Sequence, residues 1–194
     1  MTEHYFTPGS GRRRRVEMDL GGRTVAMTTA EGLFSADGLD HATRVLLEHA
    51  PAPTGGTLLD LGCGWGPIAC TLADRAPAAD VWAVDVHDDA LALTAENAAR
   101  AGVSVHTARP EDVPADLRFD EIWSNPPIRI GKAALHELLL TWLARLAPDG
   151  VAHLVVGRNL GADSLQRWLI EQGHRTERIA SSKGFRVLSA SARD

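Results

Sequence analysis

The amino-acid sequence predicts an α/β fold in which a doubly wound, mostly parallel sheet of seven strands carries helices on both faces. From residue 57 onward, short apolar segments alternate with helical segments of ten or more residues, which is typical of βαβ units. The last two strand-like segments follow each other without a helix, so we expect an antiparallel C-terminal strand. The chain has 194 residues, 44% of them hydrophobic, which suffices for one domain with a buried core.

The first fifty residues predict a β-hairpin followed by a helix. Residues 13–20 and 23–28 alternate moderately between polar and apolar around Gly21–Gly22, which indicates a two-residue turn. The segment DHATRVLLEHA at 40–50 has the pattern of a helix, and Pro51 closes it.

The remainder of the chain supplies the sheet and its covering helices. We expect strands at 57–61, 80–86, 103–108, 119–124, 151–157, 174–180 and 185–191, and helices at 67–76, 88–102, 132–148 and 164–173. Asp88 is the expected N-cap of the second of these helices, and Gly102 lies just past its end. We expect residues 1–50 to pack on a core of residues 51–194, so that the whole chain is one structural domain.

Composition and charge exclude several classes of protein. The net charge is −5 and the pI is about 5.9, whereas a protein that coats nucleic acid is usually basic, so no DNA partner is expected. Charges interrupt every apolar run, so no segment can span a bilayer, and the polar N-terminus has no secretory h-region. The two cysteines are too few for a disulfide scaffold, and we expect a reduced, cytoplasmic protein. The eight histidines show no metal-ligand spacing, so no metal site is expected.

Four consecutive arginines, Arg12 to Arg15, stand out on this acidic background. They could bind phosphates, but alternate residues of a strand face opposite sides, so only two would point toward one ligand. Charges that protect an edge strand from aggregation explain the run equally well, and both interpretations stay open.

A glycine-rich loop follows the first strand of the predicted core, in the segment LLDLGCGWGPIA at 58–69. Glycines at this place permit a tight turn and let a ligand approach the backbone, and Asp85 ends the next strand, where its carboxylate can accept ribose hydroxyls. Pro67 occupies the position of the third glycine in a dinucleotide fingerprint, which weakens a pyrophosphate interpretation.

The order of an acidic residue and then GxGxG resembles the S-adenosylmethionine loop of the Rossmann-like class I methyltransferases. On this interpretation the cofactor amine contacts Asp60 or a carbonyl, its carboxylate contacts loop N–H groups, and Trp65 lines the methionine pocket. The cofactor-binding candidates are Asp60, Gly62, Cys63, Gly64, Asp85, Val86, Asp112 and Asn125. A purely structural glycine turn is the alternative.

The adenine end of such a cofactor would lie beyond the third core strand, in HTARPEDVPAD. Glu111 or Asp112 could accept a hydrogen bond from the adenine amine, with Ala108 or Arg109 against the ring. A solvated acidic loop explains the same residues, and both interpretations stay open.

The segment SNPPIR at 124–129 lies at the end of the fourth core strand. Its two consecutive prolines have no N–H donor, so neither a helix nor a hydrogen-bonded strand ladder can continue through them. An asparagine Oδ1 and a proline carbonyl can each accept one N–H bond of a conjugated amine, which directs its lone pair at a methyl group. We therefore predict catalytic roles for Asn125 and Pro126 as acceptors, and for Pro127 through its rigidity. Alone, an N-P-P sequence is more often a plain turn.

Residues after this corner are candidates for binding the substrate. Ile128 stands where many amino-methylating enzymes have an aromatic residue, and it could still cover one face of a base. Arg129 and Lys132 flank the corner and could contact phosphate.

Motifs spread over nearly the whole chain resemble the guanine-specific methyltransferases of small-subunit ribosomal RNA, within the methyltransferase small domain family. They are HYFTP, EGLFSADGLDHATRVLL, LLDLGCGWGPI, AVDVHDDAL, SNPPIRIGK and KGFRVLSA. The resemblance implies transfer from S-adenosylmethionine to guanine N2 of ribosomal RNA. The sequence leaves the oligomeric state open, with a monomer favoured. It also implies that Phe34 folds over the cofactor or target, although a hydrophobic plug is an equal explanation of that side chain.

Two other functions stay open on the sequence alone. The first is N-methylation of a protein glutamine or a small metabolite, which the acidic balance favours. The second is a weakly catalytic RNA-binding factor in ribosome assembly.

Overall fold

The computed structural model describes residues 12–31 and 38–193. Its strands are β1 (Arg13–Leu20), β2 (Arg23–Ala30), β3 (Thr57–Leu61), β4 (Asp80–Val84), β5 (His106–Ala108), β6 (Phe119–Ser124), β7 (Leu146–Gly157), β8 (His174–Ser182) and β9 (Phe185–Arg193). Its α-helices are α1 (His41–His49), α2 (Pro67–Arg75), α3 (Asp88–Ala101), α4 (Lys132–Leu143) and α5 (Ala162–Glu171). Three short 3-10 helices are η1 (Pro110–Asp112), η2 (Ile128–Ile130) and η3 (Arg158–Leu160).

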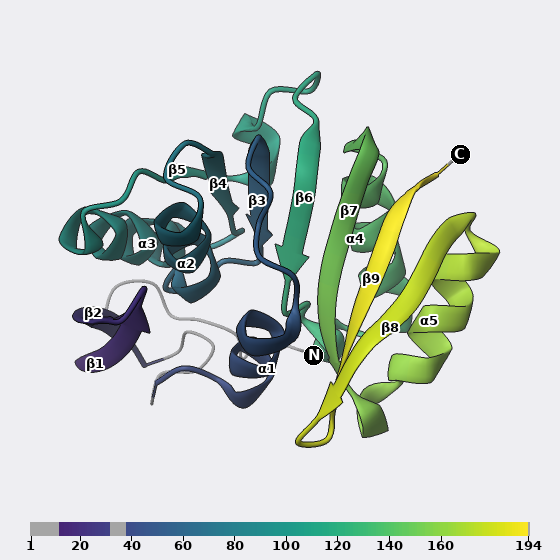
Figure 1. Cartoon of the computed structure of the whole chain (residues 1–194), viewed down its shortest axis with the longest axis horizontal. Coiled ribbons are helices and arrows are strands. Elements are labelled where there is room, and N and C mark those ends of the chain that lie inside the picture. The colour runs from purple at the N-terminus through teal and green to yellow at the C-terminus, as the bar shows by residue number, and fades with distance from the viewer. Residues whose placement is uncertain (1–11, 32–37, 194) are drawn as a thin grey trace, which may run out of the picture.

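Seven strands form one twisted sheet in the order β5-β4-β3-β6-β7-β9-β8 (Figure 1). The pairs from β5 through β7 are parallel, and β9 runs antiparallel to both β7 and β8. The strands β1 and β2 form a separate antiparallel hairpin. The predicted fold class is therefore confirmed, including the N-terminal hairpin and the antiparallel strand near the C-terminus.

The two faces of the sheet carry different helices because successive residues of a strand point in opposite directions. Leu58 belongs to a core with α1, α2, α3 and the hairpin, whereas its neighbour Leu59 belongs to a core with α4 and α5. Figure 1 shows α1 lying across the lower end of the sheet, beside the end of β6. Among the described residues, no helix combines the length and the apolar character needed to cross a bilayer.

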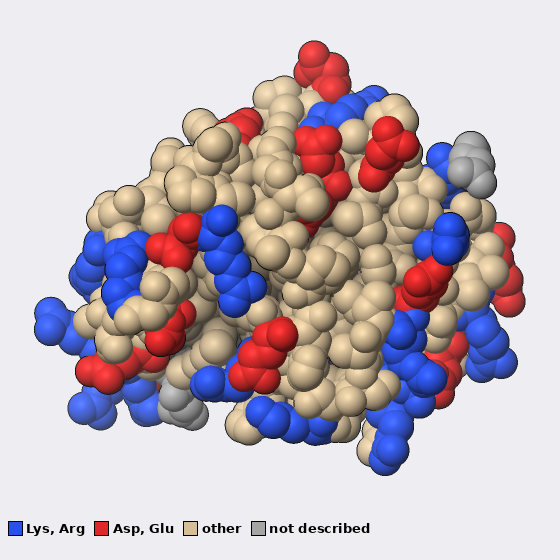
Figure 2. Space-filling view, viewed as in Figure 1, with Lys and Arg blue, Asp and Glu red and all other residues tan. Residues whose placement is uncertain are grey.

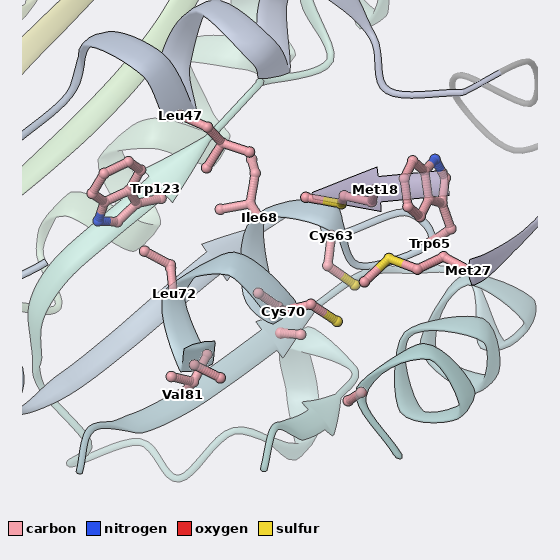
Figure 3. Packing of buried hydrophobic residues seen from close by; sticks show 14 of the residues in the cluster. Met18, Met27, Leu47, Cys63, Trp65, Ile68, Cys70, Leu72, Val81 and Trp123 are labelled. Atoms are coloured by element: carbon pink, nitrogen blue, oxygen red, sulfur yellow. The ribbon is translucent and has the colours of Figure 1, made fainter. Parts of the chain in front are cut away.

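The N-terminal hairpin is packed on the glycine-rich loop. Met18 and Met27 lie beside Trp65, whose side chain is 2% exposed (Figure 3). The buried amide of Asn97 on α3 connects the two parts: its Nδ2 donates to the carbonyls of Thr28 and Trp65, both at 2.8 Å, and its Oδ1 accepts from the Thr28 N–H at 2.7 Å. One side chain therefore satisfies three buried backbone groups.

Several predicted element boundaries were wrong, and tertiary contacts explain the differences. The helix expected at 132–148 ends at Leu143, and β7 already begins at Leu146. Phe119 donates its N–H to the carbonyl of Arg145 at 2.9 Å and pairs with Leu146, so this segment joins the sheet instead of extending the helix. The third core strand also covers only His106–Ala108, because only these residues pair with β4.

The predicted N-cap of α3 was also wrong. The cap is His87, whose side chain makes no capping bond, and Asp88 is the first helical residue. The carboxylate of Asp88 accepts two bonds from Arg109 at 2.8 Å, so a long-range partner takes the side chain that could have capped the helix. Gly102 ends the helix in a left-handed conformation, with φ of 71°, as expected.

Replacing Asn97 with alanine should lower the free energy of unfolding by about 2–4 kcal/mol, because three buried backbone groups lose their partner. Urea unfolding monitored by circular dichroism measures the change. The same substitution at the exposed Asn159 is the matched control and should change the stability by less than about 0.5 kcal/mol. Equal effects of the two substitutions would show that Asn97 does not hold the hairpin.

Candidate active site

The candidate site lies where the winding of the sheet reverses. The chain runs from β3 to β4 and β5 on one side and then returns to β6 on the other side of β3. Ligands of open α/β sheets bind beyond the carboxyl ends of strands at such a point. The hydroxyl of Ser124 at the end of β6 donates to the carbonyl of Leu61 at 2.7 Å, which holds the two strand ends together.

A small cavity of about 30 Å³ opens between these strand ends. It is lined by residues from three separated segments of the chain: Asp40, Thr43, Gly62, Cys63, Gly64, Trp65, Pro67, Ile68 and Asn125. The structure thus brings the glycine-rich loop and the NPP corner together, as the sequence predicted, and adds the start of α1.

The backbone of the glycine-rich loop is turned inward. The N–H groups of Gly62 and Cys63 both donate to the carbonyl of Val84, and the Gly64 N–H donates to Asp85 Oδ2 at 3.0 Å. These three N–H groups are therefore already hydrogen-bonded within the protein, and a ligand carboxylate would need other donors of the loop.

Open space lies outside the loop instead. Gly62 and Gly64 have φ angles of 79° and 57°, which disfavour side-chain-bearing residues, and a Cβ at either would meet nothing within 4 Å. This bare backbone lets a ligand lie directly against the loop.

Asp85 and Val86 follow β4 beside the loop. The Asp85 carboxylate accepts from Gly64 and from the His87 N–H at 3.1 Å, and a carboxylate has about four acceptor sites, so capacity remains for hydroxyl donors. The side chain of Val86 is 59% exposed, which gives a bare apolar surface next to a polar anchor. A ribose and a flat ring are ligands that such a pair can hold.

Asp60 lies completely buried under the loop. Its Oδ2 accepts from the Ala69 N–H at the start of α2 at 2.9 Å, and its buried Oδ1 has no hydrogen-bond partner within residues 12–31 and 38–193. Burial raises the pKa of the carboxyl from 3.8 to about 8, and the negative charge of Asp85 adds to the effect. A cation near Oδ1 would reverse this shift.

Cys63 also lines the cavity, but its chemistry is inert. Burial, assisted by the charges of Asp60 and Asp85, raises the pKa of its thiol well above the ordinary value, so the thiol stays neutral. The sulfur accepts a hydrogen bond from the Thr94 hydroxyl at 3.5 Å. Cys63 therefore acts as a small buried wall of the site.

The two acidic candidates beyond β5 differ in their surroundings. Arg109 bonds to Asp88 through two of its nitrogens and lies 3.8 Å from Glu111. Asp112 is exposed and forms no ion pair in the part of the chain that the structure describes. The geometry leaves Asp112 as the carboxylate open to a new partner.

The NPP corner is a rigid turn. Pro127 has φ of −74° and ψ of 76°, the values of an inverse γ-turn, and the Ile128 N–H donates back to the Pro126 carbonyl at 2.8 Å. The ring of Pro127 restricts φ to this region, so the turn is fixed before any ligand binds. The Pro126 carbonyl keeps a second lone pair for another donor.

The side chain of Asn125 has a defined orientation. Its Nδ2 donates to Asp40 Oδ2 at 2.9 Å and to the Thr43 hydroxyl at 3.1 Å. Because these two partners accept, the amide nitrogen must face them, and Oδ1 is left as an acceptor on the other side. Asp40 also caps α1 by accepting from the N–H groups of Ala42 and Thr43.

Asp40 and Thr43 were not predicted as site residues from the sequence. An aspartate before an apolar helical segment signals an N-cap, and that signal is present. The contact with Asn125, 85 residues away, depends on where α1 packs, which no local pattern reveals.

The remaining candidates lie on or near η2. Ile128 is half-buried, and Arg129 and Lys132 are exposed beside the corner. The prediction for Phe34 falls on residues 32–37, outside the described residues. No cluster of three or more potential metal ligands occurs within the described segments.

Two residues of the arginine run make ion pairs within the protein. Arg13 binds Glu96 on α3 at 2.8 Å, and Arg14 binds Glu31 at 2.9 Å. These contacts fit a charged edge strand held to its own domain rather than a free phosphate-binding surface.

Comparison with known proteins decides the family. The model of the methyltransferase small domain matches residues 24–189. The chain belongs to this family. It is a methyltransferase that depends on S-adenosylmethionine, and the bare glycine backbone and the exposed Val86 fit that cofactor.

Individual relatives fall into two size groups. The protein YbxB of Bacillus subtilis is 27% identical and matches over 98% of both chains. The ribosomal RNA small subunit methyltransferase C of Aeromonas hydrophila is 35% identical over 89% of this chain but only 51% of its own length. The chain therefore spans about half the length of the ribosomal RNA methyltransferases that it matches.

Solved structures agree with the family assignment. The 16S rRNA N2 G1207 methyltransferase (RsmC) of T. thermophilus, in complex with AdoMet and guanosine, superposes with a TM-score of 0.81 at 25% identity. The match covers 95% of this chain and 52% of that one. A ribosomal protein L11 methylase from Lactobacillus delbrueckii, with a TM-score of 0.66 at 22% identity over 84% of this chain and 82% of its own, shares the fold.

The stability of the ligand-free protein should fall as the pH rises from 5 to 8. The folded pKa of Asp60, about 8, lies above its ordinary value of 3.8, so the folded state binds the proton more tightly. The resulting stabilisation is fully present below about pH 4 and is lost as the pH passes 8, with a slope of at most about 1.4 kcal/mol per pH unit. Urea unfolding at a series of pH values measures it.

Asp60→Asn is the control for this pH dependence, because an amide keeps an acceptor for the Ala69 N–H and does not titrate. The variant should show a flatter profile than the wild type between pH 5 and 8. Parallel profiles would mean that Asp60 is not the group responsible.

Proposed function

We propose that this protein transfers a methyl group from S-adenosylmethionine to an exocyclic amine, namely N2 of a guanine in ribosomal RNA. The orientation of the Asn125 amide carries the proposal, because it presents an acceptor oxygen at the carboxyl end of β6, next to the glycine-rich loop. The similarity to ribosomal RNA small subunit methyltransferases C supports the choice of substrate.

The chemical difficulty lies in the nucleophile. The amine of guanine is conjugated with the ring, so its lone pair is delocalised and attacks poorly. When bound, S-adenosylmethionine supplies an electrophilic methyl group on a sulfonium. The protein must therefore hold the amine in the less conjugated, pyramidal form with its lone pair directed at that methyl group.

Two acceptors at the corner can hold the amine in this form. Oδ1 of Asn125 and the free lone pair of the Pro126 carbonyl would each accept one N–H of the target. The inverse γ-turn at Pro127 holds the Pro126 carbonyl in place before the substrate arrives, and the hydrogen bonds to Asp40 and Thr43 orient the Asn125 amide. Methyl transfer leaves a cationic nitrogen, which loses a proton to water, so the site needs no general base.

Other residues of the site would hold the cofactor and the base. We assign Asp85 to the ribose hydroxyls, Val86 to the adenine face and Asp112 to the adenine amine, and the bare backbone of Gly62 and Gly64 to the methionine part. From beneath the loop, the Asp60 carboxylate would attract the cationic amine of the cofactor. Ile128 would cover one face of the guanine, and Arg129 and Lys132 would contact flanking phosphates.

Labelled S-adenosylmethionine and purified small ribosomal subunits provide the direct test. Label should appear in N2-methylguanosine after digestion of the RNA, and nucleosides from cells without the gene should lack that modification at one position. Label that enters a protein glutamine instead would favour the alternative that the acidic net charge suggests. Stable RNA binding without any turnover would favour an assembly factor.

Asn125→Ala should lower kcat for RNA methylation by about 10²-fold or more, because the amine loses an acceptor on which its position depends. Affinity for the cofactor, measured by calorimetry, should change far less. An unchanged kcat would remove the NPP corner from the mechanism.

Asp40→Ser tests whether Asp40 acts through Asn125. Serine still caps α1, so thermal stability should be retained, but its short side chain cannot reach the Asn125 amide. We expect kcat to fall about tenfold while KM for RNA stays the same. The double variant Asp40→Ser with Asn125→Ala should be no slower than Asn125→Ala alone, whereas additive losses would show independent roles.

A further inference from the structure

A second and larger pocket lies on the same edge of the sheet, outside the site described above. It has a volume of about 240 Å³ and is lined by Arg158, Ser181, Ser182, Lys183, Gly184, Phe185 and Arg186. Three of these side chains are cations, two carry hydroxyls, and none is a carboxylate. Such a lining suits an anion much better than an apolar ligand.

The pocket is built from the ends of three strands. Arg158 follows β7, Lys183 occupies the turn between β8 and β9, and Arg186 lies near the start of β9, paired with Val156. The Arg158 N–H donates to the Gly184 carbonyl at 2.8 Å, which fastens the turn to the end of β7. The backbone positions of the three cationic residues are therefore fixed relative to one another.

The turn itself is rigid for a local reason. Lys183 and Gly184 have φ angles of 50° and 84°, and two successive positive φ angles define the tight hairpin turn that matches the twist of the strands. Lys183 is the only residue other than glycine with a positive φ in the described segments. A lysine at this position is disfavoured sterically, so a folding role alone would select asparagine or glycine.

The nearby carboxylates do not neutralise the positive charge of the pocket. Lys183 Nζ lies 3.9 Å from Glu48 Oε2, and Arg186 forms an ion pair with Asp163. Both carboxylate side chains are about half exposed and water screens them. Arg158 has no ion pair within residues 12–31 and 38–193, so one of the three cations is uncompensated.

The pocket and the NPP corner lie on the same edge. Asn125 follows β6, and β6, β7 and β9 are neighbours, so two strand spacings of about 5 Å each separate the corner from the start of β9. Figure 2 shows Lys and Arg gathered at the lower right, over the turn of β8–β9 and the start of α5, whereas most of the charged side chains at the top are Asp and Glu. Positive charge over this turn would attract a polyanion to the edge that carries the candidate active site.

We propose that the pocket of Arg158, Lys183 and Arg186 binds a backbone phosphate of the RNA that flanks the target nucleotide. The proposal rests on the proposed function, because it assumes that the target amine belongs to RNA. The serine hydroxyls and the three cations recognise the phosphate without reading sequence, and the stacking and acceptor groups at the corner recognise the base.

Two variants with equal charge loss test the proposal. Arg158→Gln with Lys183→Asn removes two charges from the pocket, and asparagine is well suited to the positive φ of the turn, so the fold is retained. Arg175→Gln with Arg178→Gln removes two charges from β8 at residues that do not line the pocket. Arg186 is left intact because its side chain is only 13% exposed and forms an ion pair with Asp163.

The measurement is methyl transfer and binding with a single-stranded RNA that the wild type methylates, at several salt concentrations. The pocket variant should raise KM for RNA about tenfold or more with kcat little changed, because it loses binding that is equal in the ground and transition states. Its plot of log affinity against log salt should be shallower than that of the wild type, by about 0.7 for each phosphate that the protein no longer neutralises. Affinity for S-adenosylmethionine should be unchanged, and the β8 variant should resemble the wild type.

A second arm identifies the phosphate. RNAs in which one linkage at a time is an uncharged methylphosphonate should bind the wild type more weakly at one position near the target, and the pocket variant should be insensitive to that same replacement. Sensitivity that persists in the pocket variant would overturn the proposal, and so would equal KM and equal salt slopes for the two charge variants.

The failure of the proposed function is a separate outcome. If the wild type methylates no RNA, both conclusions fail together. If it methylates RNA and the pocket variant does so equally well, only the phosphate pocket fails. If a protein is the substrate and only its KM responds to the pocket variant, the pocket recognises an acidic polypeptide and the RNA inference is overturned.

Discussion

The site depends on the alignment of two strand ends, which the hydrogen bond from Ser124 Oγ to the Leu61 carbonyl fixes. Gly62 comes directly after one of these ends and Asn125 directly after the other. Both strands are central and buried, so their relative position is set by the packing of both core layers. Any shift of one strand along the other would separate the bare glycine backbone from the acceptor oxygens of the corner, and the hydrogen bond between the ends opposes that shift.

Most of the fold could be predicted because its signals are local. Strand alternation, the Gly21–Gly22 turn and the glycine after α3 each act within a few residues, and each was found in the structure. The errors arose where a distant partner decided the local structure. Arg109 takes the carboxylate of Asp88, and pairing with Phe119 draws residue 146 into β7. A sequence pattern does not contain these partners, since they depend on the completed fold.

The two sequence motifs of the candidate site could be predicted, but the hydrogen bonds that connect them to the rest of the protein could not. The glycine-rich loop and the NPP corner carry residue types with a restricted set of uses, so they could be recognised in isolation. Other contacts at the site are tertiary. Val84 and Asp85 accept hydrogen bonds from N–H groups of the loop, and Asp40 and Thr43 orient the amide of Asn125. For this reason the sequence identified which atoms could take part in chemistry but not which of them were already hydrogen-bonded within the protein.

Asp40 links two functions that are usually separate. As an N-cap it satisfies backbone donors at the start of α1, and its same oxygen, Oδ2, accepts from the Asn125 amide. The helix therefore contributes to the site through its packing against β7 and β9, although none of its residues needs to touch the reacting atoms. A change that moves α1 would rotate the Asn125 amide, because the amide nitrogen follows its acceptors, and the acceptor oxygen would leave the position from which it can hold the target amine.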